Sequence, residues 1–154
     1  MTEFLETTVD KFTFKVAKDR LYTRDGVWLL ATENPEGGMV RIGLTDYLQQ
    51  YSGDIAFVNL KPIGTVLSTG DDLAEIETIK VNISLPSPIS GTVAEINKSL
   101  EIHPELVNQD PYNKGWLVML KPVEWTVSRR ELLDADTYFA VMQKQIDEEL
   151  RETS

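Results

Sequence analysis

Between residues 74 and 85, apolar side chains alternate with polar ones, and the phase of this alternation changes once. In the first part of the segment the apolar residues occupy even positions, whereas from Ile79 to Leu85 they occupy odd positions. Successive side chains of a β-strand point to opposite faces of a sheet, so a change of phase marks a chain reversal or a bulge. The pattern predicts two strands joined by a hairpin tip near residues 77–80, with Lys80 at or beside the tip and facing solvent.

The residues around Lys80 form a candidate site. Ile79 and Val81 are apolar and β-branched, and we expect them to hold the tip down on the sheet. Glu75 and Glu77 allow three interpretations: solvated acids of a turn, partners that keep the lysine charged, or contacts for a modifying ligase. By its spacing alone, Lys80 is an ordinary solvated lysine.

The rest of the chain is also rich in strand patterns. Short alternating or apolar runs predict further strands at residues 12–16, 28–32, 40–44, 55–60 and 65–67. Turn-forming residues at 34–38 join the second and third of these runs into a hairpin. Thr45 followed by Asp46 predicts the start of a short helix, because a threonine hydroxyl can cap free amide groups, and Gly53 ends that helix.

A weak internal repeat relates two of the β segments. Residues 53–59 match residues 91–97, with identical Gly, Ala and Asn and with Ile and Val exchanged at two further positions. Such a repeat predicts two similar β units related by a pseudo-twofold axis.

The C-terminal segment has a helical pattern instead. Ser128 and Glu131 have the spacing of a capping box, which predicts a helical region over residues 128–151. Apolar side chains then recur at steps of three or four residues, at Phe139, Met142, Ile146 and Leu150. We expect this apolar stripe to pack on the sheet rather than to bind a partner.

Composition narrows the chemistry that is open to the chain. It has no cysteine and one histidine, His103, which excludes disulfides, thiolate nucleophiles and metal sites built from several histidines. Acidic residues outnumber basic ones by 25 to 15, and the net charge of −10 argues against nucleic acid and anionic membranes as partners. No pair of titratable groups stands out as a general acid and base, so we expect a protein without catalytic activity.

Length and hydropathy bound the organisation. The 154 residues predict a single domain over residues 1–154, mainly β, with a short internal helix and a C-terminal helix. No apolar run approaches the ~20 residues that span a bilayer. The N-terminus lacks a basic region followed by an apolar stretch, so we expect a cytoplasmic protein.

Segments along most of the chain, taken in their order and spacing, resemble the glycine cleavage H protein family. The resemblance runs from Tyr22 to about Tyr138. Its parts are 22–24 with Trp28, 40–47, 53–58, Glu77-Thr78-Ile79-Lys80-Val81, 87–93, 97–101, 104–108, 110–112 and 115–117. The resemblance implies a barrel-sandwich hybrid of two small sheets, the lipoyl/biotinyl hammerhead fold, with a lipoyl group in amide linkage to Lys80.

The same resemblance implies the role and the partners of the chain. It would be a cofactor-bearing carrier subunit of a multienzyme system, with Glu77, Ile79 and Val81 as the context of the modified lysine. A lipoate ligase or lipoyl transferase would attach the group, and it would have to deprotonate the amine, because lysine is almost entirely charged at neutral pH. Acylation would remove that charge and bring the sulfur atoms that the chain lacks.

The chain departs from the family pattern at several places. Gly26 and Val27 stand where the family usually has His-Glu before the tryptophan, and residues 81–83 are larger than usual after the lysine. An N-terminal extension over residues 1–20 and the long C-terminal helix are additional. These features resemble the lipoate-binding proteins of the sulfur-oxidising, heterodisulfide-reductase-like pathway.

We therefore expect the arm on Lys80 to shuttle a sulfur-bound intermediate to a heterodisulfide-reductase-like complex, sheltered by a less polar cleft near Trp28. The alternative is a glycine cleavage H protein, which carries an aminomethyl group between glycine decarboxylase, aminomethyltransferase and dihydrolipoyl dehydrogenase. Two other classes stay open. A biotinyl carrier would use the same lysine but usually has methionines on both sides, where this chain has Ile79 and Val81. An unmodified barrel could serve as a scaffold.

Overall fold

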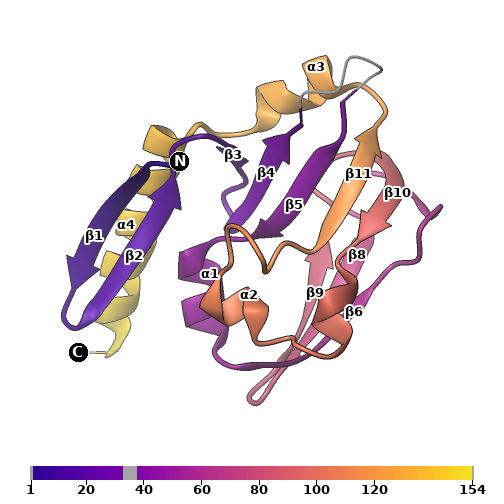
Figure 1. The fold of residues 1–154 in the computed structure, drawn as a ribbon. Coiled ribbons are helices and arrows are strands. Elements are labelled where there is room, and N and C mark those ends of the chain that lie inside the picture. The colour runs from indigo at the N-terminus through magenta and orange to yellow at the C-terminus, as the bar shows by residue number, and fades with distance from the viewer. Residues whose placement is uncertain (1, 33–37, 154) are drawn as a thin grey trace.

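The computed structural model describes residues 2–32 and 38–153. The chain forms a mainly β body, and beside it lies a smaller part made of the N-terminal hairpin and the long C-terminal helix (Figure 1). The prediction of a mainly β chain with a short internal helix and a C-terminal helix is confirmed. The turn predicted at residues 34–38 lies almost entirely outside the described residues, although the two strands that flank it do pair.

Two antiparallel sheets build the body, one with the strand order β3-β4-β5-β11-β10-β7 and one with the order β6-β8-β9. The strands of the larger sheet are β3 (Leu21–Tyr22), β4 (Val27–Ala31), β5 (Val40–Leu44), β11 (Val118–Pro122), β10 (Gly91–Ile96) and β7 (Val66–Leu67). The strands of the smaller sheet are β6 (Ile55–Leu60), β8 (Asp72–Thr78) and β9 (Asn82–Pro86). Each predicted strand segment therefore has a counterpart in one of the sheets or in the N-terminal hairpin.

The two sheets face each other across a first hydrophobic core. Ile42 and Leu120 enter it from the larger sheet, and Ile76 and Leu85 enter it from the smaller one, all of them buried. Burial of such a side chain stabilises the fold by roughly 1.5–3 kcal/mol. Two small sheets around one core are the arrangement that the barrel-sandwich prediction requires.

The weak internal repeat has a structural counterpart. Its first copy forms β6 in the smaller sheet, and its second copy forms β10 in the larger sheet. Both strands shift register at the same place in the repeat, between Ile55 and Phe57 in β6 and between Val93 and Glu95 in β10. A bulge at matching positions bends both strands alike, which supports the prediction of two similar β units.

Short helices cover the ends of the sheets. Helix α1 (Asp46–Ser52) begins after Thr45, whose hydroxyl oxygen accepts the N–H of Leu48, and it ends at Gly53 with φ 83°. Both ends agree with the prediction. The other short helices are η1 (Lys98–Glu101), α2 (Leu106–Gln109), α3 (Trp125–Ser128) and η2 (Arg129–Glu131).

The long helix α4 (Ala135–Thr153) begins later than the pattern predicts. Ser128 makes no side-chain capping bond, so the predicted capping box is wrong. Asp134 caps the helix instead, since its carboxylate accepts a backbone N–H of the first turn at 2.8 Å. Between the helical turns, Leu133 pairs with Tyr22 in a bridge to β3, and a helical periodicity gives no sign of such a long-range pairing.

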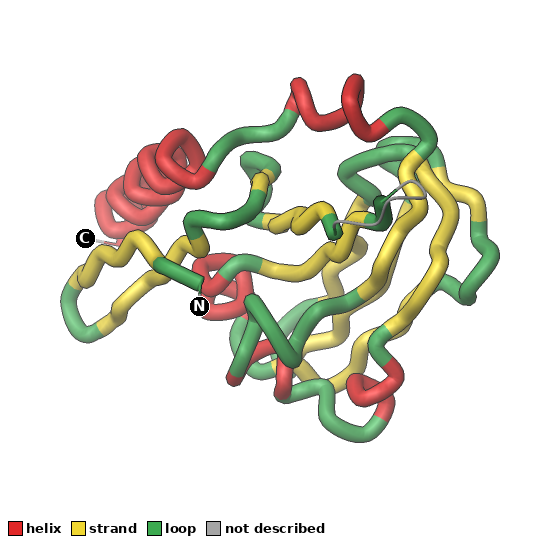
Figure 2. The backbone as a smooth tube through the Cα atoms, turned by 45° about the horizontal axis from the view of Figure 1, so that its top comes forward, coloured by secondary structure: helices red, strands yellow, loops and turns green. Residues whose placement is uncertain are grey.

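The apolar stripe of α4 packs within the chain, as predicted, but the sheet that it covers is mainly the two-stranded N-terminal one. It packs against the hairpin of β1 (Phe4–Val9) and β2 (Phe12–Ala17), and the two close a second hydrophobic core. Figure 2 shows this hairpin beside α4. Met142 and Ile146 of the stripe are buried, whereas Leu150 at its end is exposed. The N-terminal extension is thus the surface that covers the C-terminal helix.

Trp28 joins this second core to the larger sheet. The indole is fully buried, and its N–H donates to the carbonyl of Pro111 at 3.0 Å. Its partner across β4 and β5 is Gly43, where a Cβ atom would lie 2.4 Å from the indole ring. Trp28 therefore fits in its place because residue 43 has no side chain.

We predict that Gly43→Ala lowers the free energy of unfolding by roughly 1–3 kcal/mol, because the added methyl group displaces the indole of Trp28. Urea unfolding followed by circular dichroism measures this change. In a Trp28→Leu background the same substitution should cost clearly less, since the smaller side chain leaves room. If the two substitutions had simply additive costs, the clash with the indole would not be their cause.

Candidate functional site

The β8–β9 hairpin closes in a tight turn over residues 78–81, with Lys80 at the third position. The backbone N–H of Thr78 donates to the carbonyl of Val81 at 2.8 Å, and the register before the turn pairs Glu77 with Asn82. The Lys80 side chain is exposed. The predicted hairpin tip and the solvent-facing lysine are therefore confirmed, and the change of phase in the apolar pattern falls at this turn.

A single hydroxyl group fixes the shape of the turn. The Thr78 oxygen accepts the backbone N–H of Val81 at 3.0 Å and that of Lys80 at 3.3 Å, and its own hydrogen goes to the carbonyl of Val81 at 2.9 Å. A hydroxyl offers one donor and two acceptor sites, so all three are used. Thr78 is itself buried at the end of β8, which places this network on the rigid side of the turn.

Two residues of the predicted site do not have the predicted role. Ile79 is 79% exposed and Val81 is 54% exposed, so neither holds the tip down. The physical reason is that the last pairs of the two ladders are Ile55 with Thr78 and Glu77 with Asn82, so both side chains lie beyond the paired part of the sheet. Thr78 holds the turn through hydrogen bonds instead, and its role was not predicted from the sequence. The signal was a threonine at the start of a predicted turn, because threonine hydroxyls bond to nearby backbone groups there.

The turn is also tied to the body from one side. The N–H of Ile79 donates to the carbonyl of Asp54 at 3.3 Å. The Asn108 side chain in α2 then holds both neighbours of Asp54: its oxygen accepts the N–H of Ile55 at 3.0 Å, and its amide donates to the carbonyl of Gly53 at 2.9 Å. Asn108 thus fixes the direction of the carbonyl that receives the turn.

The amine of Lys80 has no ionic partner among the described residues, where every ion pair involves other side chains. Glu77 is half-buried and pairs across the smaller sheet with Phe57, on the face away from the first core. Glu75 lies exposed on the same face, two residues earlier. Neither acid pairs with the lysine. Solvated acids and ligase contacts are the two interpretations that stay open for them.

A cavity of about 240 Å³ opens beside Val27, between the β3–β4 connection and the far end of β9. Its lining residues are mostly apolar or uncharged: Thr23, Asp25, Val27, Thr69, Gly70, Leu85, Pro86, Ser87 and Pro88. Leu85 lies five residues from Lys80, which is roughly 17 Å along a strand. The cavity lies near Trp28, as predicted, but Val27 borders it, because the indole itself is enclosed in the second core.

The packing of α4 explains the residue at position 26. Gly26 has φ 93°, and a Cβ atom there would lie 3.0 Å from the Thr45 hydroxyl and 3.3 Å from the hydroxyl of Tyr138 in α4. Burial raises the pKa of Tyr138 to about 12, so this hydroxyl stays protonated and can donate to Thr45. An imidazole has no room at this position.

The chain is similar to known proteins over most of its length. The family model described as "Glycine cleavage H-protein" matches residues 20–145. The glycine cleavage system H protein of Thermus thermophilus is 41% identical over 130 residues, which are 84% of this chain and 98% of that protein. The H protein of Bacteroides thetaiotaomicron is 40% identical over 121 residues, 79% of this chain and 92% of that protein. The chain belongs to the glycine cleavage H-protein family.

A solved structure agrees with this assignment. The crystal structure of a glycine cleavage system H protein from Mycobacterium marinum is similar with a TM-score of 0.67 at 32% identity, covering 79% of this chain and 94% of that one. Proteins of this family are non-catalytic carriers that bear lipoate covalently on a lysine. The relatives named here do not support the narrower resemblance to lipoate-binding proteins of the sulfur-oxidising pathway.

Residues 2–32 and 38–153 lack two features. No helix there is long and apolar enough to cross a membrane. No cluster of three or more histidine, aspartate or glutamate side chains that could hold a metal occurs there either.

We predict that Thr78→Val loosens the turn and costs about 1–2 kcal/mol of stability, because two backbone N–H groups lose their acceptor. Amide hydrogen exchange at residues 80 and 81 should become faster, and lipoylation by a ligase should become slower. Thr65→Val is the matched control, since it removes a hydroxyl that donates to a carbonyl at 2.7 Å in another exposed turn. Equal lipoylation rates in the two variants would show that the Thr78 network does not position Lys80.

Proposed function

We propose that Lys80 is the residue on which this chain carries lipoate. The observation that supports this is the presentation of an exposed amine, with no ionic partner among the described residues, on a turn whose backbone is fixed by Thr78 and Asp54. An amide bond requires an amine that a ligase can reach and deprotonate, and none of the described contacts involves the Lys80 side chain. The residues present therefore fit the group.

The chain's own residues keep the attachment point still. Thr78 holds the turn, while Asn108 and Asp54 hold the turn against the body, so that motion is confined to the side chain of Lys80 and what it carries. When bound, lipoate supplies a disulfide that can open to two thiols. The chain has no cysteine, so no thiol of the protein competes in exchange with them.

We further propose that the arm serves a glycine cleavage system and carries an aminomethyl group. The chain spans nearly the whole length of relatives that bear this name, which supports the assignment. Its enzymes would then be glycine decarboxylase, aminomethyltransferase and dihydrolipoyl dehydrogenase. Asp25 offers one carboxylate at the cavity beside Val27, where it would attract a cationic amine.

One observation favours a second candidate, the transport of sulfur to a heterodisulfide-reductase-like complex. Val27 contributes an apolar side chain to the cavity at a position where the family usually has a carboxylate, and Leu85 and Pro86 extend the apolar wall. A lining of this kind suits a neutral, sulfur-bearing cargo better than a charged amine. The two candidates share Lys80 and differ in cargo.

We predict that Lys80→Arg abolishes lipoylation and leaves the melting temperature nearly unchanged, because an exposed turn residue contributes little to either core. Intact-mass analysis after co-expression with a lipoate ligase, or of protein from the native host, measures the modification. Lys61→Arg, which alters another exposed lysine, should be modified like the wild type. A lipoyl mass on the Lys80→Arg protein would place the modification elsewhere, and a bare wild-type chain would remove the carrier role.

The cargo can be tested with glycine. Lipoylated protein incubated with glycine decarboxylase and glycine should acquire a methylamine group on the arm, visible as a mass increase, and Lys80→Arg should acquire none. The Thermus thermophilus H protein serves as the positive control for the enzyme. If that protein loads while this chain does not, the glycine cleavage role is wrong and the sulfur candidate is favoured.

A further inference from the structure

A groove crosses the end of the molecule where the N-terminal hairpin, α1 and the last turns of α4 meet. Three adjoining cavities of about 230, 190 and 270 Å³ form it, and neighbouring cavities share lining residues. The shared residues are Phe12 and Phe14 from the hairpin, Tyr47 and Tyr51 from α1, and Glu149 from α4. We call this feature the hairpin–helix groove.

Aromatic side chains line the hairpin–helix groove and remain open to solvent. Phe12 is 60% exposed and Tyr51 is 67% exposed. Tyr47, beneath them, donates its hydroxyl to the carboxylate of Glu149, and burial together with that bond raises the pKa of Tyr47, so the donor stays protonated. The floor of the groove is thus fixed, while its rim offers uncovered aromatic surface of the kind that marks interaction sites.

The charged residues that line the three cavities are all acidic. Asp10, Asp25, Glu148 and Glu149 line the three cavities, and among the described lining residues none is a lysine or an arginine. Carboxylates beside exposed aromatic rings attract lysine and arginine side chains, both by charge and by cation–π contact. The complementary ligand is a segment that combines basic and apolar residues.

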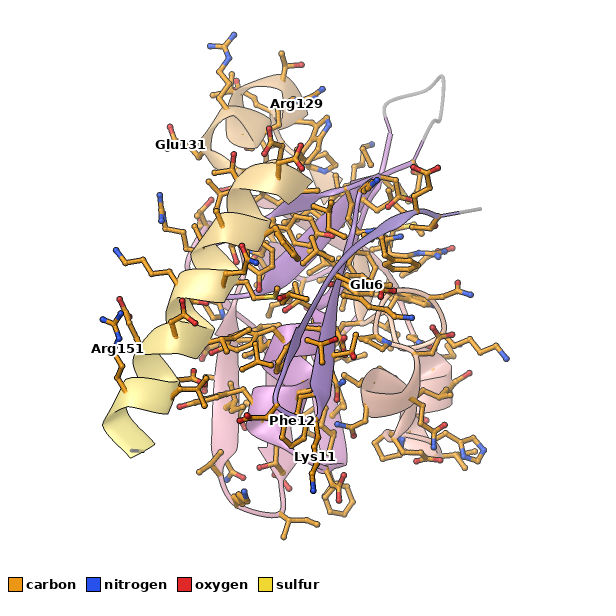
Figure 3. All side chains as sticks on the ribbon, turned by 90° about the vertical axis from the view of Figure 1, so that its left-hand side faces the viewer. Glu6, Lys11, Phe12, Arg129, Glu131 and Arg151 are labelled. Atoms are coloured by element: carbon orange, nitrogen blue, oxygen red, sulfur yellow. The ribbon has the colours of Figure 1, made fainter. Side chains whose placement is uncertain are left out.

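The hairpin–helix groove lies close to the carrier lysine. Tyr51 lines the groove from the last turn of α1, and Asp54, three residues later, accepts the N–H of Ile79 beside Lys80. Three residues span at most roughly 10 Å. Phe12 and the β8–β9 tip also lie toward the same lower end of the molecule (Figures 1 and 3).

Much of the hairpin–helix groove is built from segments that the family model does not match. The matched segment covers residues 20–145, whereas Phe12, Phe14 and Glu149 lie outside it. A docking site made from these residues is therefore an addition to the carrier body of the family.

We propose that the hairpin–helix groove docks a basic, apolar segment of an enzyme that acts on the arm of Lys80. This inference rests on the proposed carrier function and adds a second contact to it. Docking near the lysine holds the active site of that enzyme within reach of the arm and so raises its effective concentration there. The hairpin–helix groove would bind the enzyme, and the turn would present the arm of Lys80 to its active site.

The test compares groove variants of the lipoylated protein with variants elsewhere on the surface. Phe12→Ala with Tyr51→Ala removes the exposed aromatic rims, and Glu148→Lys reverses one charge. Ile102→Ala, at 78% exposure, and Glu131→Lys, at the opposite end of the molecule in Figure 3, are the matched controls. Because all five side chains are exposed, melting temperatures and lipoylation levels should stay near those of the wild type.

For the enzyme that uses the groove, the groove variants should raise KM and Kd by roughly tenfold with an unchanged kcat, since docking and chemistry are separate. The control variants should behave like the wild type. Binding is measured by calorimetry with each of the three glycine cleavage enzymes, and KM and kcat are measured for loading by glycine decarboxylase.

The outcomes separate the two proposals. If wild type and groove variants load and bind equally well with all three enzymes, the docking inference falls and the carrier function stands. If the wild type neither loads nor binds, the glycine cleavage function falls, and the docking inference falls with it. If light scattering shows that the wild type self-associates and the groove variants do not, the occupant is a second copy and the inference is overturned.

Discussion

The indole of Trp28, packed on the bare backbone of Gly43, is the contact that lets this chain build two cores rather than one. It fills the outer face of the larger sheet at a point where any side chain at position 43 would exclude it. The guanidinium of Arg20 lies 4.6 Å above the ring, and it also donates to the carbonyl of Tyr112 at 2.8 Å. The N-terminal hairpin and α4 pack around Trp28 and complete the second core.

The sequence predicted what local periodicity can encode. The tip that presents Lys80, the helix between Thr45 and Gly53, and most of the body strands follow from side-chain alternation and turn residues, whereas β3 and β11 were not predicted. The start of α4 did not follow, because Leu133 is held extended by a bridge to Tyr22. The partner of the α4 stripe was also missed, since an apolar pattern shows that a face is buried but not what buries it.

The candidate site was also predicted only in part from the sequence. The position and exposure of Lys80 could be predicted from the phase of the strand pattern. Of the residues that hold it, Thr78 had a local signal that was missed, whereas Asn108 and Asp54 could not be predicted because they act from distant segments. The expectation that apolar flanks fix the tip failed for a geometric reason, since Ile79 and Val81 lie beyond the last pairs of the ladders, where their side chains are exposed.

Membership of the H-protein family makes the chain a carrier protein. Which cargo it carries depends on the side chains that line the cavity beside Val27. The cavity beside Val27 has one carboxylate at its margin and apolar groups elsewhere, so it has features of both candidate environments. Gly26 belongs to the same question, because the packing of Tyr138 against its backbone ties that position to the additional helix. Tyr138 itself lies within residues 20–145, so this packing belongs to the part of the chain that the family model matches.

The exposure of Ile79 and Val81 has a practical consequence for anyone who wishes to observe the arm at work. The shape of the turn is set by the hydroxyl of Thr78 and by main-chain groups, so the side chains on either side of Lys80 contribute little to it. Spectroscopic reporters, such as a spin label or a small fluorophore on an introduced cysteine, can therefore be attached at either position. They would sit beside the moving tether without disturbing its anchor.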